Sequence, residues 1–384
     1  MSTRSAYGLG MISDFAEEGW PSMDLTSKVL MDYLGPESQD ALQVTELRAR
    51  FRKIMGRVPL IGSMRTPCNI DRFLNRFVTY PKALRKVRQD FDVYHVADHS
   101  YSHLLHSLRS GITGVYCHDL DTFKCLLDPA AEARPLWFKA MVRNILSGFE
   151  SAQVIFHSTL EMKQQILGNG LGQRARLVHA PLGVNPAYFH RDGLAPNEII
   201  PGLTGDYLLH VGSCIPRKRI DFLLNVFHGV RALHPRIRLI QIGGKWSAEN
   251  KFTIAELGLA ESVSQVRGIP DSSLASLYRG AKALLVTSDS EGFGIPVIEC
   301  LASQTPVIAT DLPVLREVGG AYVSFVPSGE LSSWVRKVDL VLNHAPQARE
   351  REAGKLHASQ FSWGNHARAI GNAYLEELSE QRRR

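Results

Sequence analysis

Two glutamates, Glu291 and Glu299, have types and a spacing that suit ligand chemistry, because they lie eight positions apart around a glycine-containing turn. Before them runs Ala283–Val286, an uninterrupted apolar stretch typical of a buried parallel strand. After the turn comes Pro296, followed by apolar residues at helical spacing. Proline fits the first turn of a helix, where its missing N–H is no loss. The sequence therefore predicts a strand, a turn and a helix start, with a carboxylate on each side of the turn.

This arrangement suits a ligand that carries both phosphate and hydroxyl groups. The backbone N–H groups of Gly294 and Ile295 would point at whatever lies above the helix start, which is a natural anion site. Glu299 could accept both hydrogens of a ribose diol, and Glu291 at the strand tip could hold the hydroxyls of a sugar. A nucleotide sugar offers all three groups. The alternative is a solvated glutamate pair beside an ordinary turn.

A basic cluster follows a second predicted strand. Tyr207–Val211 is apolar, Gly212 and Ser213 form a turn, and Arg217 and Lys218 precede an amphipathic helical pattern. In a Rossmann-like unit, phosphates bind at the loop after the first strand. The pattern predicts such a unit with a phosphate-binding basic loop. A solvated basic turn is the alternative.

Polar residues also end two predicted strands in the first half of the chain, Asp98 and His99 after one and His118 and Asp119 after the next. Side chains at the carboxyl ends of strands line the crevice of a doubly wound sheet, so we expect both pairs there. The alternative for each histidine is a structural role. The histidines show no ligand spacing on a shared helix face, so no metal site is expected.

The loop after the first predicted strand, Tyr7–Ile12, lies where an open parallel sheet binds ligands. It contains Gly19 and Trp20 and leads into a predicted helix, Leu25–Leu34. Trp20 is either a platform on which a sugar stacks or an anchor for the loop.

The length and composition of the chain are typical of a two-domain α/β protein. A chain of 384 residues exceeds what one core usually serves, and 44% apolar with 21% charged residues is ordinary for this class. Five scattered cysteines form no C-x-x-C pair, so neither a disulfide framework nor a zinc site is indicated, and a reducing cytoplasm fits. We expect no signal peptide, and no apolar run approaches the ~20 residues of a membrane span.

The net charge of +6 is concentrated in one block, residues 48–88, where twelve basic residues stand against one acid, Asp71. The basic residues are Arg48, Arg50, Arg52, Lys53, Arg57, Arg65, Arg72, Arg76, Lys82, Arg85, Lys86 and Arg88. Such a block indicates a face toward membrane headgroups, a lipid diphosphate or nucleic acid, or else a merely solvated face. No nucleic-acid-binding motif accompanies it. The expected location is cytoplasmic, with peripheral attachment to the inner face of the membrane as the further possibility.

These motifs together resemble the retaining GT-B glycosyltransferases of family four. The text E-G-F-G-I-P-V-I-E, from Glu291 to Glu299, is close to that family's E-x7-E element. His118–Asp119 matches a family pair after the same strand, Lys218 matches the lysine of its R-K-G or R-K-N segment, and residues 181–185 resemble its P-x-G-V-[DN] loop. Ser213 stands where the family commonly has arginine, and Arg217 is the candidate replacement.

The resemblance implies an α/β, GT-B fold with two Rossmann-like doubly wound domains facing a central cleft. The Pro/Gly-rich stretch Asp192–Gly205 is the expected hinge. The expected boundaries are an acceptor domain at 1–190, a linker at 191–205, a nucleotide-sugar-binding domain at 206–362, and a helix at 363–384 that returns to the first domain.

The resemblance also implies a role for each candidate residue. The catalytic candidates are Glu291, His118, Lys218 and Arg217. The candidates for binding the donor nucleotide sugar are Gly212, Ser213, Gly243, Arg267, Ile269, Gly292, Phe293, Gly294, Ile295 and Glu299. The candidates on the acceptor side are Gly19, Trp20, Asp98, His99 and Asp119.

The implied activity is transfer of a hexose, with retention of configuration and without a metal or other cofactor, from a nucleoside-diphosphate sugar to a hydroxyl of a saccharide or lipid-linked acceptor. The loop at 212–218 favours mannosyl- and polysaccharide-building members, hence GDP-mannose as donor. The alternatives are a sugar phosphorylase, a sucrose- or trehalose-type synthase of the same fold, or a catalytically silent nucleotide-sugar-binding module.

Overall fold

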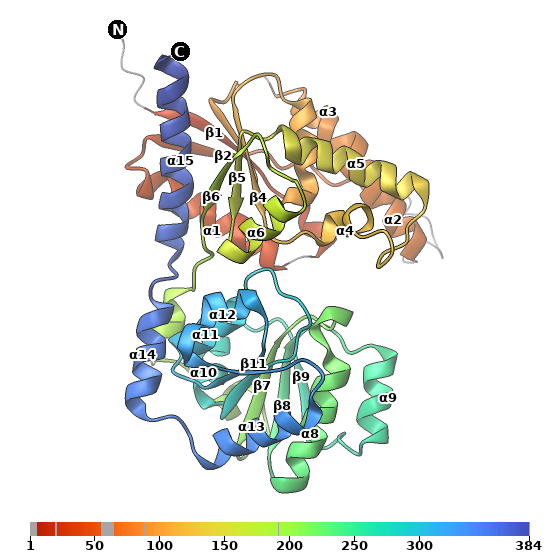
Figure 1. Ribbon diagram of the computed structural model, residues 1–384, viewed down its shortest axis with the longest axis vertical. Coiled ribbons are helices and arrows are strands. Elements are labelled where there is room, and N and C mark those ends of the chain that lie inside the picture. The colour runs from red at the N-terminus through yellow and green to blue at the C-terminus, as the bar shows by residue number, and fades with distance from the viewer. Residues whose placement is uncertain (1–5, 20, 55–64, 88–89, 191, 384) are drawn as a thin grey trace. The chain divides into compact units, whose positions relative to one another are not determined.

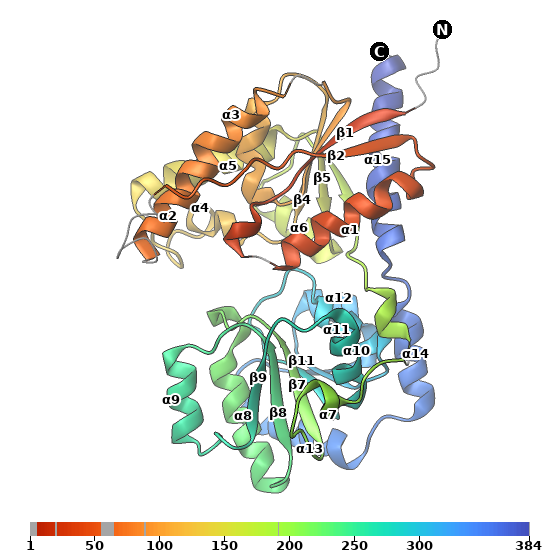
Figure 2. The ribbon, with the colours of Figure 1, turned by 180° about the vertical axis from the view of Figure 1, so that it is seen from behind.

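A computed structural model describes residues 6–19, 21–54, 65–87, 90–190 and 192–383. The chain divides into two compact units, one formed by Met1–Pro181 together with Trp363–Arg384 and the other by Leu182–Ser362. Each unit has one parallel sheet of six strands with helices on both of its faces (Figures 1 and 2). The expected fold class, α/β with two Rossmann-like doubly wound domains, is therefore confirmed.

The first unit has the strand order β2-β1-β3-β4-β5-β6. The strands are β1 Tyr7–Ile12, β2 Leu42–Glu46, β3 Val93–Val96, β4 Ile112–Cys117, β5 Val154–His157 and β6 Arg176–His179. The helices are α1 Pro21–Glu37, α2 Arg65–Leu74, α3 Tyr80–Leu84, α4 Lys124–Leu127, α5 Leu136–Ser151, α6 Leu160–Gly168 and α15 Trp363–Arg383, with a π-helical turn at Asn75–Thr79 and a long 3-10 segment at His99–Ser107.

Successive side chains of a strand point to opposite faces of the sheet, so the sheet of the first unit has two different buried faces. Val96 and Val115 point into a core shared with α5 and the 3-10 segment. The neighbouring residue His95 points to the other face, where its Nδ1 lies 2.7 Å from the hydroxyl of Tyr374 on α15. Because β1, β3, β4 and β5 are buried on both faces, their apolar runs are nearly continuous, which is why they are visible in the sequence.

The second unit has the strand order β12-β11-β10-β7-β8-β9. The strands are β7 Tyr207–Gly212, β8 Arg238–Gly243, β9 Val263–Val266, β10 Ala283–Val286, β11 Val307–Thr310 and β12 Val323–Val326. The helices are α7 Pro196–Ile199, α8 Ile220–Leu233, α9 Ala248–Glu256, α10 Asp271–Gly280, α11 Ile295–Ala302, α12 Pro313–Gly319, α13 Leu331–Asn343 and α14 Ala348–Ala358. Its main core lies between the sheet and helices α8 and α13, around Phe227 and Trp334.

The division between the units differs from the expected boundaries. It lies at Pro181–Leu182 rather than after residue 190, and the described part of 191–205 belongs to the second unit. The physical reason is anchoring, because the Arg279 guanidinium donates to the carbonyls of His190 at 2.7 Å and Asp192 at 2.9 Å. The segment expected as a hinge is thereby tied to α10.

Within the described residues, no helix is both long enough and apolar enough to pass through a bilayer.

Candidate active site

The second sheet has a topological switch point between β7 and β10. From β7 the chain moves outward through β8 and β9 on one side, and then continues through β10, β11 and β12 on the other. In open parallel sheets ligands bind at such a point, outside the carboxyl ends of the strands. The two loops that leave it are 213–219 after β7 and 287–294 after β10, and they hold the basic cluster and the first of the two glutamates.

Lys218 and Glu291 form an ion pair between these loops. The Lys218 Nζ lies 2.6 Å from Oε1 and 2.8 Å from Oε2 of Glu291, whose side chain is only 6% exposed. The Ser288 hydroxyl donates to Oε1 at 2.6 Å, and Arg217 Nη1 donates to Oε2 at 3.2 Å. Three of the four predicted catalytic residues are therefore in direct contact in this unit.

Backbone hydrogen bonds hold the two loops together. The Asp289 N–H donates to the carbonyl of Arg217 at 2.8 Å, and the Thr287 hydroxyl donates to the carbonyl of Lys218 at 3.1 Å. A short 3-10 turn at Pro216–Lys218 ends at Arg219, whose φ of 50° lies in the left-handed region that non-glycine residues rarely adopt. The sharp turn directs Lys218 toward the strand ends while α8 begins at Ile220.

The electrostatics of the pair keep Glu291 ionised. Burial raises the pKa of Glu291, but the charges of Lys218 and Arg217 and the hydrogen bonds from Lys218 and Ser288 outweigh it, so its pKa is lowered. His210, at the end of β7, is buried beside the pair. Burial, with a smaller contribution from the charge of Lys218, lowers the pKa of His210 to about 3, so this ring is neutral.

Helix α11 begins as the sequence predicts, directly after a glycine. Gly294 has a φ of 95°, and a side chain there would come within 2.6 Å of Leu315, so both the conformation and the space require glycine. In the first turn of α11 Pro296 has no N–H and the Val297 N–H donates to the carbonyl of Gly294 at 2.8 Å, whereas the N–H of Ile295 has no acceptor within the helix. Phe293 packs its ring against Phe361 in the interior, and Gly292 is half-buried.

Glycines also line the ends of β7 and β8. Gly243 has a φ of 121°, and a side chain on it would overlap the carbonyl of Gly212. The two strand ends therefore approach more closely than side chains would allow. Ser213 is half-buried beside them, whereas Arg267 is exposed and Ile269 half-buried in the loop after β9.

Glu299 belongs to a different network from Glu291. It lies on the buried side of α11, and its Oε2 accepts a hydrogen bond from the Tyr278 hydroxyl at 2.9 Å. Burial raises the pKa of Glu299 to about 7, against the opposing effect of the Tyr278 hydrogen bond. The two glutamates of the sequence motif thus have opposite pKa shifts.

The remaining predicted residues gather in the first unit, at the carboxyl ends of β3 and β4. His99 Nδ1 lies 3.2 Å from Asp98 Oδ1, and His99 Nε2 lies 3.7 Å from Asp119 Oδ1. Burial lowers the pKa of His99, but the hydrogen bond and charge of Asp98 outweigh it and raise the pKa overall. His99 therefore lies between two carboxylates that favour its protonated form.

A hydrogen bond defines the tautomer of the His118 ring. Its Nε2 lies 2.9 Å from the carbonyl of Ala97, which can only accept, so Nε2 carries the proton and Nδ1 is the acceptor. Burial lowers the pKa of His118, which favours this neutral form. Gly19 is exposed with a φ of 74°, and Trp20 lies outside the described residues.

Sequence reasoning did not identify three polar residues of these clusters. Ser288 and His210 touch or face the Lys218–Glu291 pair, and Asp14 lies at the end of β1. Ser288 and Asp14 follow predicted strands on the carboxyl side, so the rule applied to the strand ends at Asp98 and His118 would have found them, whereas His210 lies within β7 and carries no such signal.

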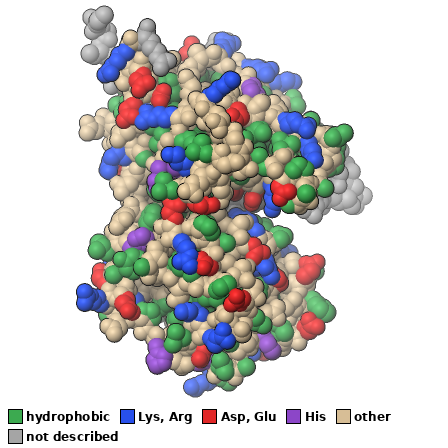
Figure 3. Space-filling model, in the orientation of Figure 1, with side chains coloured by type: hydrophobic (Ala, Val, Ile, Leu, Met, Phe, Trp, Pro, Cys, Tyr) green, Lys and Arg blue, Asp and Glu red, His purple; other side chains and the backbone are tan. Residues whose placement is uncertain are grey.

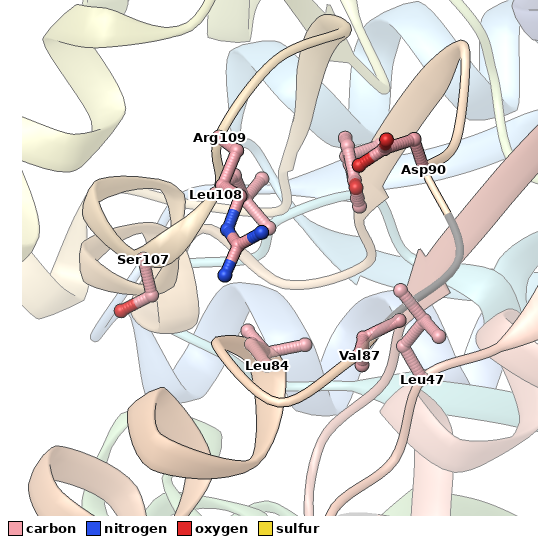
Figure 4. A pocket seen from close by; sticks show the side chains of 8 residues that line it. Leu47, Leu84, Val87, Asp90, Ser107, Leu108 and Arg109 are labelled. Atoms are coloured by element: carbon pink, nitrogen blue, oxygen red, sulfur yellow. The ribbon is translucent and has the colours of Figure 1, made fainter.

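Two hollows of the surface lie away from the Lys218–Glu291 pair. One in the first unit, lined by residues that include Leu47, Leu84, Asp90 and Arg109, encloses about 10 Å³, the room of one water molecule (Figure 4). One of about 600 Å³ in the second unit lies where β11 and β12 begin, at the edge opposite Lys218. Among the residues that the structure describes, no group of three His, Cys, Asp or Glu side chains is placed to hold a metal ion.

Comparisons with known proteins agree with this geometry. The sequence model of the family described as "Glycosyl transferases group 1" matches residues 199–355, which include Lys218, Glu291 and Glu299. The O-antigen chain mannosyltransferase B of Escherichia coli is 26% identical over 290 residues, covering 71% of this chain and 72% of that protein. The D-inositol 3-phosphate glycosyltransferase of Mycolicibacterium smegmatis is 28% identical over 247 residues, covering 61% of this chain and 55% of that enzyme.

Solved structures show the same fold over nearly the whole chain. The sucrose-phosphate synthase of Thermosynechococcus elongatus has a TM-score of 0.77 at 18% identity, covering 97% of this chain and 100% of that one. HepE of Anabaena, solved with UDP-glucose, has a TM-score of 0.69 at 14% identity, with the same coverage of both chains. The chain is therefore similar in sequence to the group 1 glycosyltransferases over residues 199–355, and it shares the GT-B fold of these solved structures.

Proposed function

We propose that the protein transfers a hexose from a nucleoside-diphosphate sugar to a hydroxyl of a saccharide or lipid-linked acceptor, with retention of configuration. The observation that carries the proposal is the Lys218–Glu291 pair at the switch point of the second sheet, beside the start of α11. Cations, a helix start and a carboxylate meet there, and a sugar diphosphate presents the matching groups.

Negative charge grows on the diphosphate as the glycosidic bond breaks, and positive charge grows on the sugar ring. Lys218, Arg217 and the Ile295 N–H at the start of α11 would stabilise the leaving phosphate oxygens, which is the effect that usually supplies most of the acceleration. An ammonium has three donor hydrogens, so Lys218 can bind a phosphate oxygen while it still contacts Glu291.

Glu291 would then position the sugar and stabilise its positive charge. A carboxylate bound to Lys218, Arg217 and Ser288 has its lone pairs engaged, which makes it a poor nucleophile. The proposed route is attack of the acceptor on the same face that the diphosphate leaves, with a phosphate oxygen taking the acceptor's proton. His118 Nδ1 would accept a hydrogen bond from a sugar hydroxyl.

The proposal includes GDP-mannose as the donor sugar nucleotide, on the basis of the loop at 212–218 and the mannosyltransferase relative. Calorimetric titration of the chain with GDP-mannose, UDP-glucose and UDP-N-acetylglucosamine tests this. Tight binding of another nucleotide sugar, with none of GDP-mannose, would replace the donor but keep the reaction class.

Retention and metal independence are tested together. NMR of the product reports the anomeric configuration, and the same reaction run with a chelator reports the metal requirement. An inverted anomer, or activity lost to the chelator and restored by Mg²⁺, would contradict that part of the proposal. Products formed with inorganic phosphate or free sugar as acceptor would instead indicate a phosphorylase or synthase.

The acceptor would come from an anionic membrane surface, since the described part of 48–88 exposes many basic side chains with apolar ones among them. The exposed basic residues of the described part of 48–88 are Arg50, Arg52, Lys53, Arg72, Lys82, Arg85 and Lys86. Exposed apolar residues among them are Ile54, Ile70, Phe73 and Val78. The segment at 52–54 is tied to α2 and the π-helical turn, because the Arg52 N–H donates to Asn75 and the Ile54 N–H to Asp71.

The start of α5 adds two large apolar side chains, Leu136 at 81% exposure and Trp137 at 66%. Figures 1 and 2 place the start of α5 and α2 at the same end of the first unit, and Figure 3 shows apolar and basic side chains side by side there. Tryptophan favours the membrane–water interface, and each basic residue near an anionic surface contributes about 1 kcal/mol.

Sedimentation with vesicles tests the membrane contact. We expect binding to vesicles containing phosphatidylglycerol, weakened by salt and by combining Trp137→Ser with Arg85→Glu, and little binding to phosphatidylcholine. Phe252→Ser with Leu356→Ser, two exposed positions of the second unit, is the matched control. Equal sedimentation of all variants, or tighter binding to an oligonucleotide, would contradict the membrane assignment.

A further inference from the structure

The first sheet has its own switch point, between β1 and β3, and an aspartate follows each of these two strands there. From β1 the chain passes to β2 at one edge and then to β3 on the other side. Ile12 of β1 is the register partner of Val96 of β3, and the Ala97 N–H donates to the carbonyl of Ile12 at 3.0 Å. Asp14 and Asp98 each lie two residues beyond this pair, in the loops that leave these neighbouring strands.

The two carboxyl groups have very different surroundings. Asp98 accepts from the Ser100 N–H at 2.8 Å and from the Ser100 hydroxyl at 2.7 Å, and it contacts His99. Asp14 is 3% exposed, and neither of its carboxyl oxygens has a hydrogen-bond donor among the described residues. The carboxyl of Asp98 is close enough to act on Asp14. Two ionised carboxylates cannot form a hydrogen bond with each other, because neither carries a hydrogen.

Other charged groups around Asp14 do not satisfy it. Arg76 stacks its guanidinium on Tyr101 at 4.1 Å, donates to the carbonyl of Ser100, and lies 3.7 Å from Glu18. Glu18 itself adds negative charge near Asp14.

The two histidines that follow β3 and β4 have other partners. His99 lies between Asp98 and Asp119, and the Nε2 of His118 contacts the Ala97 carbonyl. The hydroxyl of Tyr80 donates to the Ser13 and Leu47 carbonyls instead. A like-charged pair at opposite positions of neighbouring strands is destabilising unless a proton or a cation joins it.

We propose that Asp14 and Asp98 share one proton, which Asp14 carries and donates to Asp98. Asp14 is then a positioning residue, because it fixes the loop after β1 to Asp98 and, through Asp98, to His99 and Asp119 on the acceptor side. Its role in transfer rests on the proposed function, whereas the shared proton does not.

The pKa shifts of the two groups agree with this assignment. Burial, with the neighbouring charge of Asp98, raises the pKa of Asp14 well above its usual value of 3.8. Burial would also raise the pKa of Asp98, but the hydrogen bond and charge of His99 outweigh it and lower that pKa. The proton therefore belongs to Asp14 and the charge to Asp98.

The test compares Asp14→Asn, which keeps a donor toward Asp98, with Asp14→Ala and Asp98→Asn. A group whose folded pKa is raised loses its stabilising contribution as pH rises through that pKa, so the contribution of Asp14 to wild-type stability falls with pH above about 4. Urea unfolding of the full chain should show a shallower fall for Asp14→Asn. The wild-type-minus-variant infrared difference spectrum at neutral pH should contain the carbonyl stretch of a protonated carboxyl.

Activity gives the second readout. With nucleotide-sugar turnover as the assay, Asp14→Ala should lower kcat/KM by roughly tenfold or more, as expected for a lost hydrogen bond to a charged group, and Asp14→Asn should recover most of it at neutral pH.

The proposal is overturned if Asp14→Asn has the wild-type dependence of stability on pH, if the carboxyl band is missing, or if Na⁺ or Mg²⁺ stabilises the wild type but not the variant. Normal infrared and stability results in a chain that transfers no sugar would refute the function and leave the shared proton intact.

Discussion

Lys218 and Glu291 are 73 residues apart in the sequence, yet the lysine Nζ contacts both carboxylate oxygens of the glutamate, at 2.6 and 2.8 Å. The contact spans the switch point of the second sheet, so it fixes the loop after β7 to the loop after β10. A buried charge pair of this kind is a weak contributor to stability, because desolvation offsets most of the attraction. A role in chemistry explains its presence better.

Replacing either Lys218 or Glu291 by alanine should lower turnover by roughly 10²–10³, the scale for losing one preorganised electrostatic group. Initial rates at saturating nucleotide sugar measure this. The control is Lys282→Ala, which breaks the exposed ion pair with Asp206, 3.2 Å long, and should leave the rate unchanged. Near-wild-type turnover from both alanine variants would refute the assignment.

The protonation of His118 should set the acid side of the pH–rate profile. Because burial lowers its pKa below 6.5, kcat/KM should stay level down to that pH and fall only below it, where Nδ1 changes from acceptor to donor. His118→Asn places an oxygen near the position of Nδ1 and should retain more activity than His118→Gln. A decline that begins above pH 6.5, or the reverse order of the two variants, would argue against this tautomer.

Glu299 should make the protein less stable as pH rises through neutrality. Its folded pKa of about 7 lies above the ordinary value of 4.5, so the folded state holds the proton more tightly, and the stabilisation present below 4.5 is lost as pH rises to about 7. Glu299→Gln should flatten urea-unfolding free energies over this range. An unchanged slope in the variant would contradict the raised pKa.

Gly114 should not tolerate a side chain. A Cβ there would overlap the hydroxyl of Tyr374 on α15, so Gly114→Ala should destabilise the chain by about 1–3 kcal/mol, the usual cost of overpacking. Tyr374→Phe removes the overlapping atom, and the double variant should recover part of the loss beyond simple addition of the two changes. Strict additivity in this double-mutant cycle would rule out the contact.

The strands of both sheets could be predicted because most are buried on two faces and their apolar runs stand out. The tip residues Asp98, His118 and Glu291 followed from the same pattern, since ligand edges lie where strands end. β2 at Leu42–Glu46 escaped prediction because it is an edge strand with alternating burial and few apolar residues.

Some properties of the site could not be predicted from the sequence, because they depend on contacts between residues that are far apart in the chain. That Glu291 and Glu299 would have opposite pKa shifts follows from Lys218 beside one and from burial of the other against Tyr278. The pairing of Asp14 with Asp98 follows from the register of β1 and β3, which no local pattern specifies. The exposed Leu136 and Trp137 look in sequence like ordinary core residues of an amphipathic helix.

Helix α15 belongs to the unit that contains the N-terminal half of the chain. The hydroxyl of Tyr374 lies 2.7 Å from His95 of β3, and Ala367 and Ile370 of the same helix are buried. During synthesis, the second unit has all of its residues available before α15 emerges from the ribosome. The unit that contains the N-terminal half of the chain is therefore completed only after the rest of the chain has been translated. Until then, the sheet face that α15 covers stays exposed. Exposed apolar surface of this kind in a growing chain is what chaperones bind.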